Sequence, residues 1–116
     1  MKRVLVGIMG ALAVGVLATP VLAQDSAKIE KGIKVYGEQK CSMCHAIAGK
    51  GNAKGTLDSV GSKLTVEEIR EWIVDPVAAT KKHKAERKPL MPGKYTSLPK
   101  EDIEALVAYM VSLKKK

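Results

Sequence analysis

Aromatic side chains are scarce in this 116-residue chain, which has no phenylalanine, one tryptophan and three tyrosines. A small domain buries proportionally little surface, and large aromatic side chains normally supply much of what it does bury. The composition therefore predicts an apolar interior that the chain's own side chains fill only in part.

Other patterns are also missing. The glycines of residues 46–62 follow neither the G-x-G-x-x-G nor the P-loop pattern, and no strand precedes them, so a phosphate-binding loop is disfavoured. The net charge is +8, but no aromatic residues alternate with the basic ones, which argues against nucleic-acid binding. No long segment alternates as a strand would, and we predict an all-α fold.

Cysteine and histidine occur twice each, as Cys41, Cys44, His45 and His83. A structural zinc ion needs four ligands around a tetrahedron, and the adjacent Cys44 and His45 are poorly placed to bind one ion together. A thiol–disulfide pair is a second alternative, but such motifs accompany a βαβ pattern that this sequence lacks.

The segment Cys41-Ser42-Met43-Cys44-His45 has the spacing that attaches a c-type haem. Each thiol adds to one vinyl group of the porphyrin, and the next residue places its imidazole beneath the iron. We therefore predict one covalently bound haem c, with thioethers from Cys41 and Cys44 and with His45 as the proximal ligand. The macrocycle would also fill the apolar deficit.

The N-terminus has the features of an export signal. Lys2 and Arg3 precede an apolar segment, and residues 21–23 form a plausible cleavage site. We expect a signal peptide over residues 1–23, a single domain over residues 24–116, and a periplasmic location without stable membrane insertion. An uncleaved membrane anchor is the alternative, because the apolar stretch is about long enough to span a bilayer.

Three helices are predicted in the mature chain. The first covers residues 26–39, with Ile29, Ile33 and Tyr36 on one face, Gly32 marking a close contact and Gly37 a possible C-cap. The segment 46–62 is expected to be a loop in which Ile47, Leu57 and Val60 touch the haem.

A capping box of Thr65 and Glu68 opens the second helix, which Asp75-Pro76 ends. Trp72 on this helix is most simply a core residue, with a haem propionate as one candidate partner for its indole N–H. The last helix covers about residues 99–113, with an apolar stripe that includes Leu106 and Met110.

Met91 is the preferred sixth ligand. It lies between two prolines in a loop far from His45 in sequence, and a thioether is a soft, neutral donor that raises the reduction potential. His83 is the alternative, and it would give a bis-histidine haem of lower potential.

The mature sequence resembles the small class I cytochromes c throughout its length. The resemblance is carried by Gly32 and Tyr36, the haem-binding segment 41–45, the run 60–65, Glu71-Trp72-Ile73, Asp75-Pro76, Met91-Pro92 and Tyr109. It implies that the first and last helices cross near Gly32 and Tyr109, and that Met91 is the distal ligand. One position differs, because Thr56 stands where this family often has a proline whose carbonyl accepts the proximal histidine's hydrogen bond; a backbone carbonyl could still serve there.

With both axial positions filled, the iron has no vacancy for a substrate, so we expect a single-electron carrier and not an enzyme. A ligand-binding sensor or a peroxidase-like enzyme is the alternative if the distal bond is labile. Basic residues concentrate at Lys81, Lys82, Lys84, Arg87 and Lys88, and again at residues 114–116. They form either a merely solvated surface or a docking surface for acidic redox partners.

Overall fold

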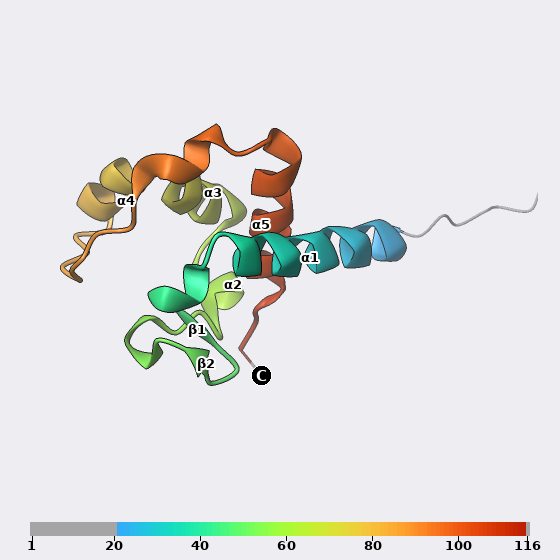
Figure 1. Cartoon of the computed structure of the whole chain (residues 1–116), viewed down its shortest axis with the longest axis horizontal. Coiled ribbons are helices and arrows are strands. Elements are labelled where there is room, and N and C mark those ends of the chain that lie inside the picture. Colours follow the sequence, from blue (N-terminus) through green and yellow to red (C-terminus); the bar gives the residue numbers. More distant parts are fainter. Residues whose placement is uncertain (1–20, 116) are drawn as a thin grey trace, which may run out of the picture.

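The computed structural model describes residues 21–115, so most of the predicted signal peptide lies outside the described residues. The described part is mostly helical, with one short hairpin, which confirms the all-α prediction (Figure 1). Its α-helices are α1 (Val21–Glu38), α2 (Val60–Lys63), α3 (Val66–Val74), α4 (Pro76–Lys82) and α5 (Lys100–Ser112). No helix within residues 21–115 is both long and apolar enough to cross a membrane.

Helices α1 and α5 form the main packing contact and cross steeply (Figure 1). A Cβ atom at Gly32 would collide with the carbonyl oxygen of Ala105 and lie 2.7 Å from Cβ of Tyr109. Only glycine lets the two backbones approach this closely, which confirms the predicted crossing. The rings of Tyr36 and Tyr109 then meet edge to face, with centroids 5.7 Å apart.

The predicted apolar face of α1 was partly wrong. Ile33 is 50% exposed, whereas Val35 is only 3% exposed and belongs to the core. The buried side follows Gly32, Val35 and Tyr36, because the contact with α5 is centred on the glycine. Gly37 lies within α1 and not at a C-cap; Lys40 has the left-handed conformation there, with φ of 56°.

The capping box at the start of α3 is confirmed. Thr65 accepts a hydrogen bond from the backbone N–H of Glu68 at 3.2 Å, and the Glu68 carboxylate accepts one from the N–H of Thr65 at 3.0 Å. Asp75 ends α3 as predicted, but its side chain also caps α4 by accepting from Ala78 N–H, and Pro76 occupies the first turn of that helix. Helix α4 was not predicted from the sequence.

The segment 46–62, predicted as a loop, contains short elements of regular secondary structure. Ala46–Ile47 (β1) pairs antiparallel with Lys50–Gly51 (β2), a 3₁₀ turn follows at Ala53–Gly55, and α2 begins at Val60. The hairpin is too short to show the alternation by which a strand is found in a sequence.

The core lies where α3 and α5 meet α1 and the 3₁₀ turn Gly93–Ser97. Every residue of the predicted α5 stripe is buried. The buried cluster consists of Val35, Ile69, Ile73, Tyr95, Ile103, Leu106, Val107 and Met110. Partly buried residues, among them Leu57 and Met91, pack around this cluster and leave a cavity on one side of it.

Candidate functional site

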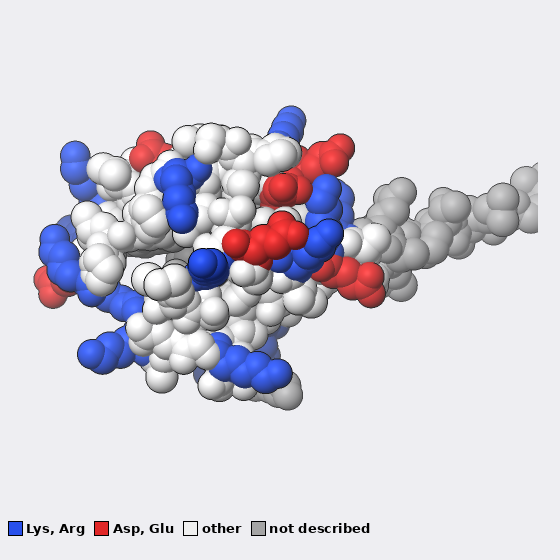
Figure 2. Space-filling view, viewed as in Figure 1, with Lys and Arg blue, Asp and Glu red and all other residues white. Residues whose placement is uncertain are grey.

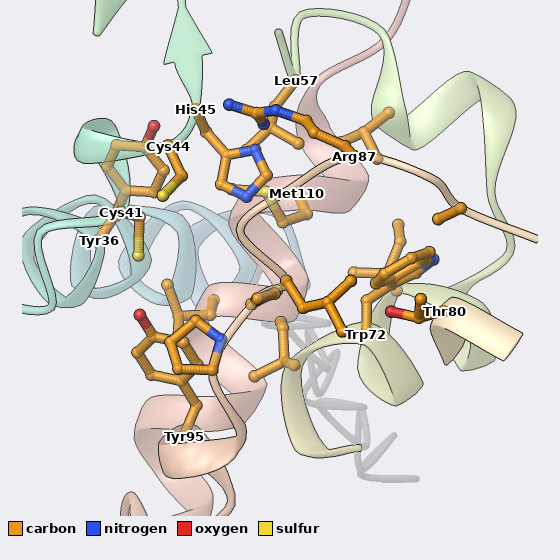
Figure 3. Close-up of a pocket in the computed structure, with 18 of the residues that line it drawn as sticks. Tyr36, Cys41, Cys44, His45, Leu57, Trp72, Thr80, Arg87, Tyr95 and Met110 are labelled. Atoms are coloured by element: carbon orange, nitrogen blue, oxygen red, sulfur yellow. The ribbon is translucent and has the colours of Figure 1, made fainter. Parts of the chain in front are cut away.

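A largely apolar cavity of about 340 Å³ lies beside the core. Its walls come from the end of α1, the haem-binding segment, α2, α3, α5 and the loop of residues 83–92 (Figure 3). The polar and sulfur-bearing residues that line it are Tyr36, Lys40, Cys41, Cys44, His45, Trp72, Thr80, Arg87, Met91, Tyr95 and Met110. Three of the four predicted site residues lie within the five-residue segment 41–45, and the fold brings the fourth, Met91, to the same cavity.

The cysteines are placed by a tight turn after α1. The left-handed Lys40 reverses the chain, and Cys41–Met43 form one 3₁₀ turn. The N–H of His45 donates to the Cys41 carbonyl at 3.0 Å, which closes the turn and brings both thiols to the cavity side. Burial raises the pKa of the Cys41 thiol. Both cysteines are free of disulfide bonds.

The His45 ring is oriented by a backbone carbonyl. Nδ1 of His45 lies 3.0 Å from the carbonyl oxygen of Gly55, and because a carbonyl only accepts, Nδ1 carries the proton. Nε2 is then the unprotonated nitrogen that a metal requires. Burial lowers the pKa of His45, the Gly55 hydrogen bond opposes this, and the positive charge of Arg87 adds to the lowering.

The carbonyl that orients His45 is that of Gly55 and not that of Thr56, the position that the resemblance implied. The Thr56 side chain is exposed and donates to Asp58 Oδ2 at 3.0 Å, and Asp58 in turn accepts from Ala48 N–H at 2.6 Å. These hydrogen bonds restrict the loop at Thr56, where a proline ring would otherwise restrict it.

The two candidates for the distal ligand are separated by the fold. Met91 lines the cavity and is half-buried against the core. His83 does not line it; its ring stacks on the outer side of Trp72 with centroids 5.6 Å apart. His83 Nε2 faces Glu68 Oε2 at 3.5 Å, which is too long for a good hydrogen bond.

Two of the three side chains expected to touch the haem line the cavity. Leu57 and Val60 line the cavity, but Ile47 packs on the core and does not. Trp72 is not a fully buried core residue, because one face of its ring closes the cavity and the other meets His83.

Arg87 was assigned to the exposed basic run, but its side chain turns inward. It lines the cavity, and Figure 3 shows its guanidinium beside the His45 imidazole. The one sequence signal was an arginine within a run of lysines, four residues before Met91.

The sequence matches the family described as Cytochrome c over residues 29–114, and the chain therefore belongs to that family. A protein described as cytochrome c oxidase subunit 2, from Alkalihalophilus pseudofirmus, is 32% identical over 93 residues, which cover 72% of this chain and 25% of that protein. The chain thus spans about a quarter of this relative's length. No solved structure matches the chain.

The residues of the cavity fit the covalently bound haem c that the family implies. Two thiols and an imidazole with a free Nε2 share one apolar cavity, and the buried hydroxyl of Tyr36 has no partner among the described residues. Family membership predicts a haem-based electron carrier more than an enzyme.

Proposed function

We propose that this chain is a periplasmic monohaem cytochrome c that carries single electrons between larger redox proteins, with His45 and Met91 as axial ligands. The observation that carries the proposal is the shared cavity. Its lining includes Cys41, Cys44 and His45 together with Met91, although Met91 lies 46 positions after His45 in the sequence. His83 is not part of this lining.

Each part of the lining has a task in this function. Cys41 and Cys44 would hold the haem through thioethers, and the Gly55 carbonyl keeps the proton on Nδ1 of His45, so that Nε2 would be free to bind iron. Leu57, Leu106 and other apolar side chains exclude water. When bound, haem supplies a one-electron iron couple, and a neutral imidazole and thioether favour a high potential for it.

Among the described residues, the cavity lining offers no carboxylate and no second histidine for a peroxidase-like reaction. No Asp or Glu of the described residues lines it, and its single histidine is oriented by a backbone carbonyl. General acid–base catalysis requires a titratable group in reach of the substrate. This arrangement favours electron transfer over the enzymatic alternative.

A docking surface for redox partners is proposed at α4 and the loop after it. Lys and Arg side chains gather at the end of the molecule formed by these segments (Figure 2). The docking surface consists of Lys81, Lys82, Lys84 and Lys88. Leu90, 44% exposed, adds an apolar contact at the cavity rim. An acidic partner fits this charge, and the likeness to part of a cytochrome c oxidase subunit supports a redox protein as that partner.

The ligation is tested by Met91→Ala in protein matured with haem. We expect the variant to keep its haem, lose the far-red sulfur-to-iron band of the oxidised form, bind carbon monoxide when reduced, and show a lower potential. Met43→Ala is the matched control, because Met43 is 71% exposed. An unchanged band and potential in Met91→Ala would refute the assignment.

Export is tested separately. N-terminal sequencing of protein recovered from a periplasmic fraction should begin at Gln24 if the signal is cleaved after Ala23. Full-length protein in the membrane fraction would identify an uncleaved anchor instead.

A further inference from the structure

Arg87 connects the loop that carries Met91 with the loop that orients His45. A Cβ atom built on Gly55 would overlap the Arg87 guanidinium and lie 2.9 Å from its Cζ atom. The same atom would overlap the Cys44 carbonyl oxygen. The guanidinium therefore occupies the space that the absent side chain of Gly55 leaves open, directly against the residue whose carbonyl accepts from His45 Nδ1.

Arg87 is a partly buried cation that has no acidic partner among the described residues. The side chain is half-buried, whereas its neighbours Glu86 and Lys88 are exposed. No carboxylate of the described residues forms an ion pair with it, although Glu68, Glu71 and Glu104 each pair with another cation or histidine. The cavity lining contains one other cation, Lys40, and no described acidic group. The cation therefore faces the site without a local counter-charge.

We propose that Arg87 is a positioning residue that holds Gly55 and, through it, His45, and that its fixed positive charge raises the reduction potential of the site. The inference rests on the proposed role of His45 as an axial ligand. It does not depend on which residue fills the opposite axial position.

Two physical effects support this role. Neither Gly55 nor the exposed Thr56 has a proline ring to restrict its backbone. The planar guanidinium of Arg87, packed against Gly55, restricts the loop in place of such a ring. In addition, a cation in a poorly hydrated cavity disfavours the more positive, oxidised state of the iron, and salt screens it less than it screens an exposed lysine.

The test compares Arg87→Met and Arg87→Lys with Lys88→Met, which removes the same charge from the exposed adjacent position. Two quantities are measured on haem-loaded protein: the reduction potential at low and high salt, and the hydrogen-exchange rate of the His45 Nδ1 proton by NMR. Arg87→Met should lower the potential at both salt concentrations and accelerate exchange about tenfold, as expected when a hydrogen bond loses its support. Arg87→Lys should keep the potential but accelerate exchange, since it retains the charge without the planar fork.

Lys88→Met should leave exchange unchanged and shift the potential only at low salt. The proposal is overturned if Arg87→Met behaves as Lys88→Met does in either measurement. Failure of the Met91 assignment is recognised separately, because the far-red band would then be missing from the unmutated protein while the exchange rates still report on Arg87.

Discussion

At the scale of single residues, burial beside the cavity changes the pKa of the Tyr36 hydroxyl. It is buried and has no hydrogen-bond partner among the described residues. Burial raises the pKa of Tyr36 from 10.0 to about 12, with a smaller contribution from negative charge on Cys41 when that thiol is ionised. Because Cys41 would be a thioether in the mature protein, burial is the cause that persists.

This pKa predicts an alkaline loss of stability. The folded state holds the phenolic proton more tightly than the unfolded chain, so the free energy of unfolding falls as the pH rises above 10 and stops falling above about 12. Burial also raises the pKa of Tyr95 and of Tyr109, so Tyr36→Phe should flatten this fall without abolishing it. Urea unfolding at a series of alkaline pH values measures the slope, and an identical slope in both proteins would contradict the prediction.

Side-chain identities indicated candidate haem ligands but not the residues that support them. Cys41, Cys44, His45 and Met91 were predicted because thiol, imidazole and thioether groups bind haem or iron, and because the spacing of Cys41, Cys44 and His45 is that of a haem attachment. Gly55 and Arg87 were not, because a backbone carbonyl looks alike at every position and a guanidinium within a basic run does not reveal which way it turns. The contact of Gly55 with His45 spans 10 residues, and the contact of Gly55 with Arg87 exists only after two distant loops meet.

At the scale of elements, the crossing of α1 and α5 depends on one position. Gly32→Ala places a Cβ against Ala105 and Tyr109, and overpacking of this kind typically costs about 1–3 kcal/mol of unfolding free energy. Gly37→Ala is the matched control. It lies in the same helix with nothing within 4 Å of the added atom, so it should stabilise by roughly 0.4–1 kcal/mol. The measurement is the shift of the denaturant midpoint relative to the unmutated protein. Shifts of equal size and sign in both variants would refute the close crossing.

Helices with local signals were the ones the sequence predicted well. The boundaries of α3 follow from a capping box and from Asp75-Pro76, and both signals act over a few residues. The same dipeptide also starts α4, since a proline that ends one helix is well suited to the first turn of another. The buried face of α1 was mistaken at Ile33 because glycine carries no hydrophobic signal, yet the tight crossing is centred there.

At the scale of the whole molecule, the uneven charge predicts how partners associate. The double variant Lys84→Glu/Lys88→Glu should slow electron exchange with an acidic partner, and the difference from the unmutated protein should shrink as salt increases. Lys28→Glu changes an exposed lysine on α1, at the opposite end of the chain's helical body (Figure 1), and should have little effect. Stopped-flow rates against ionic strength give the measurement. Because Lys28→Glu makes half the charge change, a decrease in log rate half as large as that of the double variant would show that only net charge matters.

The sequence by itself determined the helical class and predicted the covalent haem and its candidate donor atoms, because periodicity, capping and ligand chemistry are properties of a few residues close together in the chain. Only the tertiary structure decided that Met91 shares the cavity with His45 while His83 stacks outside Trp72. It also decided that Gly55 orients the histidine with Arg87 packed against it. These arrangements join loops that are distant in sequence, and their positions follow from how α1, α3 and α5 pack and not from any local preference of the loops.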